Sequence, residues 1–119
     1  MIKAMILAAA ALTMSANTAD AQTMIQKNNI KVENHLMTPE ALWAMGRIGG
    51  TAASPNGKQI VYQVGYYSVK ENKSHQMLFI MDAKGKNKKA LTTDAKSETD
   101  AAWIQGGQKI AFIRGGQLW

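Results

Sequence analysis

The spacing of apolar and polar residues changes several times along this chain of 119 residues. An apolar run over residues 4–12 gives way to a polar stretch, residues 22–36, that shows no sustained period. Residues 37–47 carry apolar side chains at helical spacing, and from residue 48 onward the period is that of β-strands. The pattern therefore predicts an extended leader over 22–36, one short helix, and then a mainly β structure.

Residues 37–47 carry the signals that begin and end a short helix. Thr38 can accept a backbone N–H as the N-cap, and Pro39 suits the first helical position because its φ is already fixed. Gly46 is expected to end the helix in the left-handed conformation. A helix of about two turns is not stable alone. We therefore expect its large apolar side chains to pack against another part of the protein; these are Leu42, Trp43 and Met45.

The part of the chain from residue 48 to residue 119 alternates apolar runs with turn residues. Residues 77–81 are apolar throughout, as expected for a strand buried on both faces, and the polar residues 68–76 before them predict a longer loop. Ser54-Pro55-Asn56-Gly57 predicts a β-turn, because proline suits its second position. Further strands are predicted over residues 60–64, 88–92, 101–103 and 109–113.

Two segments of this strand-rich part repeat. Residues 54–62 align with 104–112 at an offset of 50, each reading as a turn, a glycine, a polar pair, a β-branched residue, a small residue and an aromatic. Residues 77–79 align with 117–119 at an offset of 40, so the first unit carries an insertion near residues 67–74. A repeat of about 40 residues with four short strands is typical of a β-propeller blade.

We therefore predict the first one to two blades of an incomplete propeller, with blade 1 at about 50–100 and blade 2 beginning at about 101–119. Each blade needs neighbours to cover its faces. The chain is accordingly expected to be a fragment that aggregates when made alone. The alternative is a small independent β-sheet domain with two similar hairpins.

The first 21 residues have the arrangement of a secretory signal. Lys3 precedes the apolar run, and Ala19-Asp20-Ala21 supplies small residues for cleavage after Ala21. The run is too short to span a bilayer, which takes about 20 residues. We expect a periplasmic or secreted protein without an integral membrane segment after cleavage; a buried N-terminal helix is the alternative.

Composition limits the chemistry. The chain has no cysteine, which excludes disulfides and thiol catalysis, and His35 and His75 are too few and too far apart to suggest a metal site. The net charge is +6, and part of it lies at a predicted hairpin tip that carries Lys84, Lys86, Lys88 and Lys89. Such a tip can bind a polyanion. No aromatic residues interleave with the lysines, so we do not expect nucleic-acid binding.

Three segments resemble the start of bacterial dipeptidyl-peptidases and acylaminoacyl-peptidases of the prolyl oligopeptidase family. The first is Met37-Thr38-Pro39-Glu40-Ala41-Leu42-Trp43 with Arg47-Ile48-Gly49, and the second is the turn and strand over residues 54–62. The third is the stretch 78–85 followed by Leu91-Thr92. Asn56 stands where that family commonly has aspartate, and the turn at 104–107 departs from the family pattern.

The resemblance implies a serine peptidase that pairs an N-terminal propeller with a C-terminal α/β-hydrolase domain. That enzyme releases dipeptides or acyl-amino acids from short peptides, and its propeller limits access to the active site. The family's catalytic serine lies in a Gly-x-Ser-x-Gly elbow, and this chain contains no such motif. We therefore assign no catalytic, cofactor or metal residue here and expect the chain alone to be inactive.

Two further expectations follow. Ser54 precedes Pro55 in a predicted turn, so we assign it a turn role and not a nucleophilic one. The expected partners are short peptide substrates, bound through the full-length enzyme, and the missing hydrolase domain. The alternative function is a non-catalytic periplasmic propeller that serves as an interaction scaffold.

Overall fold

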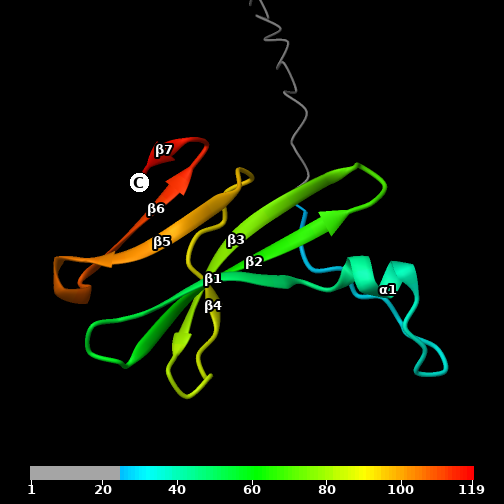
Figure 1. Ribbon diagram of the computed structural model, residues 1–119, viewed down its shortest axis with the longest axis horizontal. Coiled ribbons are helices and arrows are strands. Elements are labelled where there is room, and N and C mark those ends of the chain that lie inside the picture. Colours follow the sequence, from blue (N-terminus) through cyan, green and yellow to red (C-terminus); the bar gives the residue numbers. More distant parts are fainter. Residues whose placement is uncertain (1–24) are drawn as a thin grey trace, which may run out of the picture.

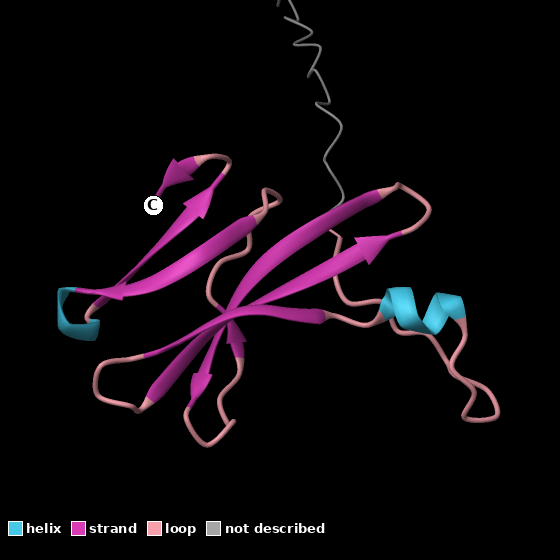
Figure 2. Cartoon of the chain, viewed as in Figure 1, coloured by secondary structure: helices cyan, strands magenta, loops and turns pink. Residues whose placement is uncertain are grey.

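The computed structural model describes residues 25–119, which form one short helix and two antiparallel β-sheets (Figures 1 and 2). The predicted signal segment, residues 1–21, lies outside the described residues. Among residues 25–119, no helix is long and apolar enough to cross a membrane. The elements in chain order are α1 (Pro39–Ala44), β1 (Arg47–Ala53), β2 (Gln59–Ser68), β3 (Lys73–Asp82), β4 (Lys89–Ala90), β5 (Glu98–Ile104), the 3₁₀ turn η1 (Gln105–Gly107), β6 (Lys109–Arg114) and β7 (Gln117–Leu118).

The first sheet is a meander in the order β1-β2-β3-β4. Its centre is the long β2–β3 hairpin, in which ten residue pairs lie in continuous register from Gln59↔Asp82 to Ser68↔Lys73. The core lies on this hairpin, where Val61 and Leu78 are almost fully buried. The predicted strand at residues 77–81 is confirmed as part of β3. The predicted loop over 68–76 is wrong, because β3 begins at Lys73 and leaves only a tight connection.

The second sheet has the order β5-β6-β7 and packs on the first. Its strand β5 lies across β1, β2 and β3 (Figure 1). The indole Nε1 of Trp103 on β5 donates a hydrogen bond of 3.0 Å to the carbonyl oxygen of Ala52 on β1, which ties the two sheets together. The described strands therefore form two stacked sheets, and the prediction of a mainly β structure with one short helix is confirmed.

The sequence repeat is reproduced in the strand register. The pair Tyr62↔Phe79 of the first sheet corresponds to Phe112 and Trp119 of the second, which exchange two backbone hydrogen bonds of 2.8 and 3.0 Å. An irregularity between Ile48 and Thr51 of β1 recurs between Thr99 and Ala102 of β5. The offsets of 50 and 40 residues thus relate two antiparallel meanders whose first strand carries an irregularity, displaced by one residue in the second unit.

The helix begins as predicted but ends earlier. The Thr38 hydroxyl accepts a hydrogen bond of 3.1 Å from the backbone N–H of Ala41, so the predicted N-cap is confirmed. The helix stops at Ala44, and Met45 is already extended, with φ −71° and ψ 132°. Gly46 does not adopt a positive φ. The prediction that it ends the helix in the left-handed conformation is wrong, because the chain passes directly into the extended β1.

The predicted turn at residues 54–57 forms at the end of β1. The backbone N–H of Gly57 donates to the carbonyl oxygen of Ser54 at 2.8 Å, and Gly57 has a positive φ of 69°. The buried Ser54 hydroxyl donates to Oδ1 of Asn56 at 2.7 Å and accepts from the backbone N–H of Gln59 at 3.0 Å. Both hydrogen bonds hold the turn, which is the role predicted for Ser54.

Candidate functional site

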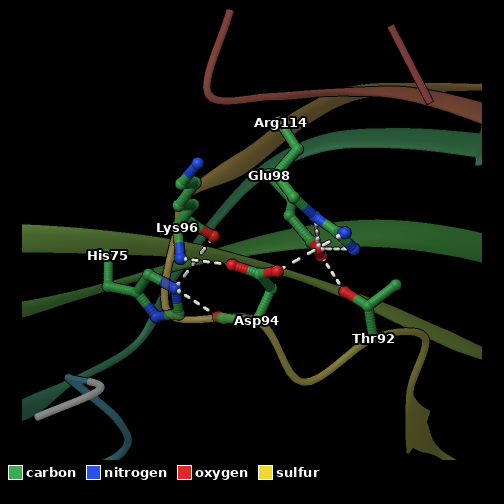
Figure 3. Close-up of polar contacts among 6 residues, drawn as sticks. All are labelled: His75, Thr92, Asp94, Lys96, Glu98 and Arg114. Carbon is green, nitrogen blue, oxygen red and sulfur yellow. Dashed lines mark hydrogen bonds and ion pairs between the residues drawn. The ribbon is translucent and has the colours of Figure 1, made fainter. Parts of the chain in front are cut away.

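The densest group of polar side chains lies at the junction of the two sheets (Figure 3). Glu98, at the start of β5, is 2% exposed, and the side chain of Arg114 on β6 is 15% exposed. Arg114 donates to Oε1 of Glu98 from Nε at 2.9 Å and from Nη2 at 2.6 Å. The Thr92 hydroxyl donates to Oε2 of the same carboxylate. Asp94 approaches the guanidinium at 3.4 Å, so two carboxylates flank one largely buried cation.

His75 forms a second polar group beside this ion pair. It is 3% exposed, on β3, and its ring nitrogens face only backbone carbonyl oxygens (Figure 3). Nδ1 lies 3.1 Å from the carbonyl oxygen of Ile25, and Nε2 lies 3.1 Å from that of Asp94 and 3.3 Å from that of Lys96. The imidazole therefore connects the leader to the segment that joins the two sheets.

The junction organises structure and offers no reacting group. Three of its four carboxylate oxygens contact the guanidinium or a hydroxyl, and the fourth, Oδ1 of Asp94, accepts a hydrogen bond of 2.8 Å from the backbone N–H of Lys96. The ring nitrogens of His75 contact backbone carbonyl oxygens. Among residues 25–119, no three His, Asp or Glu side chains are placed to hold a metal ion. Ser54 bonds within its own turn and lies on a different element from both histidines. The geometry therefore assigns a packing role to this cluster.

Sequence reasoning missed this ion pair, although the repeat contained a signal for it. At an offset of 50, Glu98 corresponds to Ile48 and Arg114 corresponds to Val64. The structure pairs Ile48 with Val64 across the first sheet and Glu98 with Arg114 across the second, in the same register. An apolar cross-strand pair in one unit is thus replaced in the other by a pair of opposite charges.

A second group of side chains lies where α1 meets the β2–β3 hairpin. The guanidinium of Arg47 lies 4.7 Å from the ring centre of Trp43 and 4.6 Å from that of Tyr67, and the two rings meet edge to face at 5.8 Å. These contacts hold the helix on β2. The large apolar side chains of the helix are otherwise half exposed, and only Ala41 is buried. The expected packing is therefore met in part, through Trp43.

Gly46, at the connection between α1 and β1, has no room for a side chain. A Cβ atom on Gly46 would lie 2.8 Å from Cε1 of Tyr66 and 2.8 Å from Cγ1 of Val64. Tyr66 is itself packed there. Its burial raises the pKa of the phenol above the usual value, and the nearby Tyr62 adds to the rise.

Replacing Gly46 by alanine is expected to destabilise the first sheet by about 1–3 kcal/mol, because the added methyl group overpacks Tyr66 and Val64. Gly50→Ala is the matched control, since no atom lies within 4 Å of a Cβ at that position of β1. The comparison is made by thermal unfolding of the complete protein. Equal melting temperatures for the two variants would contradict the proposed close contact.

The sequence was compared with protein families and with known proteins. No protein-family model matches the sequence. The sequence is nevertheless homologous to dipeptidyl-peptidases, which confirms the predicted resemblance to dipeptidyl-peptidases. The relatives are dipeptidyl-peptidase 5 of Porphyromonas endodontalis, 42% identical over 81 residues, and dipeptidyl-peptidase 5 of Porphyromonas gingivalis, 36% identical over 113 residues.

The matched regions cover 68% and 95% of this chain. They cover only 12% and 15% of the two relatives. The chain thus corresponds to a small part of a dipeptidyl-peptidase, consistent with an N-terminal part.

Proposed function

We propose that this chain forms the N-terminal propeller portion of an exported serine peptidase of the prolyl oligopeptidase family. The complete enzyme would release dipeptides or acyl-amino acids from short peptides. The observation that carries this proposal is the homology to dipeptidyl-peptidase 5. The repeated register of the two sheets supports the propeller part of it, because propeller blades are antiparallel meanders that recur along the chain.

Burial at equivalent repeat positions also supports stacking of further blades. Leu78 of β3 is 0% exposed and lines a cavity with Asp100 and Ala101 of β5, whereas Leu118 of β7, at the equivalent position, is 74% exposed. A face with the same pattern is therefore covered in the first unit and open in the second. A third sheet packed on the second would bury Leu118.

In this proposal the chain takes no part in bond cleavage. The nucleophile, base and acid belong to a hydrolase domain, and the blades form one wall of the chamber that admits short peptides. The exposed apolar side chains of the leader and α1 supply a surface on which that domain could pack. They are Ile30, Val32, Leu36, Met37, Leu42, Trp43 and Met45.

The proposal is tested with the protein expressed from its complete gene. We expect it to cleave a fluorogenic dipeptidyl-amide, to lose activity after treatment with a serine-directed organophosphate, and to cleave the same sequence much more slowly within a long folded polypeptide. Residues 22–119 expressed alone should cleave none of these substrates.

Two outcomes would contradict the proposal. Complete resistance to the serine reagent would exclude the serine mechanism. A purified, folded complete protein without amidase activity would favour the interaction scaffold.

A further inference from the structure

The structure gathers six lysines at one end of the two sheets, which we call the cationic end. They lie on three turns, formed by residues 54–58 between β1 and β2, residues 82–89 between β3 and β4, and residues 105–109 between β5 and β6. All six are exposed: Lys58, Lys84, Lys86, Lys88, Lys89 and Lys109. The sequence indicated a cluster of only the four lysines at the hairpin tip, and the fold brings Lys58 and Lys109 to the same end.

Direct contacts hold the three turns together. The backbone N–H of Ala83 donates to the carbonyl oxygen of Lys58 at 2.9 Å, which joins the first two turns. A Cβ atom on Gly107 would lie 2.9 Å from Cδ of Pro55, so the third turn lies against the first. Figure 1 shows the three turns at the same end of the sheets, away from α1. The positions of the lysine backbones are therefore fixed by the fold.

Most of the excess charge of the described residues lies at this end. The three turns contain six lysines and one acidic residue, Asp82. The rest of residues 25–119 contains seven basic and six acidic side chains, which nearly cancel. The chain therefore has one strongly positive end on an otherwise balanced surface.

The composition of the three turns indicates the kind of partner. They contain no arginine, no aromatic residue and no leucine, isoleucine, valine or methionine. The turns thus lack aromatic rings on which bases stack, and they lack the planar fork of arginine that recognises single phosphates or carboxylates in a bidentate way. Several mobile ammonium groups without apolar anchors suit a broad anionic surface to which the protein binds without insertion.

We propose that the cationic end binds peripherally to the surface of a membrane rich in anionic lipid headgroups. Clustered lysines are attracted by the negative surface potential of such a membrane. The attraction is screened beyond about 8 Å at physiological ionic strength, so the binding is reversible by salt. The orientation places α1 and its exposed apolar side chains at the end remote from the membrane.

The test is co-sedimentation of the complete protein with lipid vesicles. One set of vesicles contains phosphatidylcholine alone, and the other contains phosphatidylcholine with about one third phosphatidylglycerol. We expect binding to the anionic vesicles only, at about 50 mM salt, and release at about 500 mM salt. Replacing the four hairpin lysines by glutamine should weaken the partition to anionic vesicles by about tenfold or more.

Two further variants test whether vesicle binding depends on the location of the lysines or only on the net charge of the protein. One variant makes the same change in net charge away from the cationic end, by replacing with glutamine Lys27, Lys31, Lys70 and Lys73. This variant should bind anionic vesicles as the parent protein does. Lys58→Gln with Lys109→Gln should weaken binding as well, although both are distant from the hairpin in sequence. All of these lysines are exposed, so the melting temperatures should not change.

Three outcomes would overturn the proposal. They are equal binding to neutral vesicles, equal loss of binding in the charge-matched control, and displacement of the protein from anionic vesicles by an equal phosphate concentration of duplex DNA. The last would assign the cationic end to nucleic acid. Each of these results is independent of peptidase activity, so failure here would leave the proposed function standing.

Discussion

Glu98→Ala is expected to lower the stability of the second sheet by about 3–5 kcal/mol, because it leaves a largely buried guanidinium without its main partner. Arg114 would keep Asp94, at 3.4 Å, as its ionic partner, together with its contacts over the rings of Phe112 and Trp119, and Thr92 would lose its acceptor. The effect is measured in the complete protein by native-state hydrogen exchange of the β5 and β6 amides, which reports the local free energy of opening.

Asp100→Asn is the matched control for this prediction. Asp100 is an exposed carboxylate in the same strand, and its contact is a hydrogen bond of 2.6 Å from the neighbouring Thr99 hydroxyl. Its replacement should change the local free energy by no more than about 0.5 kcal/mol. Similar exchange rates for Glu98→Ala and Asp100→Asn would show that the ion pair does not stabilise the junction.

Leu78→Ala is expected to cost about 2–5 kcal/mol, because it opens a cavity at the fully buried centre of the first sheet. The loss of stability caused by the same change at the equivalent position, Leu118→Ala, shows whether a further blade packs on the second sheet or whether the second sheet ends the stack. If a further blade covers the second sheet in the complete protein, Leu118→Ala should cost a comparable amount. If no blade covers it, the loss should be near zero, as expected for a residue that is 74% exposed.

The measurement is urea unfolding of both variants of the complete protein, followed by tryptophan fluorescence. Val69→Ala is a control for loss of an exposed apolar side chain, since Val69 is 67% exposed and is not among the side chains proposed to pack against the hydrolase domain. A large effect for Leu78→Ala together with none for Leu118→Ala would contradict the stacked-blade arrangement. The first sheet would then be packed as described, and the second would be its terminal cover.

The elements themselves could be read from the sequence where local chemistry decides them. The N-cap at Thr38, the turn at Ser54 and the apolar strand around Leu78 each depend on residues within a few positions of one another. The predicted loop over 68–76 was wrong for a related reason. Its residues are polar, but they continue the register of the β2–β3 hairpin, and cross-strand pairing outweighed their composition.

The candidate site required the tertiary structure. The sequence could give the offset that relates Ile48 to Glu98, but not that Glu98 is buried, because burial depends on the sheet that packs against it. Similarly, the sequence indicated only that His75 and His35 do not suggest a metal site, and the structure buries His75 against three carbonyl oxygens from distant segments.

The sequence by itself determined a mainly β chain with one capped helix, a repeat at offsets of 50 and 40 residues, and a resemblance to dipeptidyl-peptidases. These features depend on the order and spacing of residues along the chain. Short-range sterics and hydrogen bonds act on that spacing to form the helix, the turns and the strands. Only the tertiary structure decided which apolar face is covered, where the Glu98–Arg114 pair lies, and that three separate turns form one cationic end. Those properties depend on how two sheets stack, and stacking joins residues that the spacing along the chain does not relate.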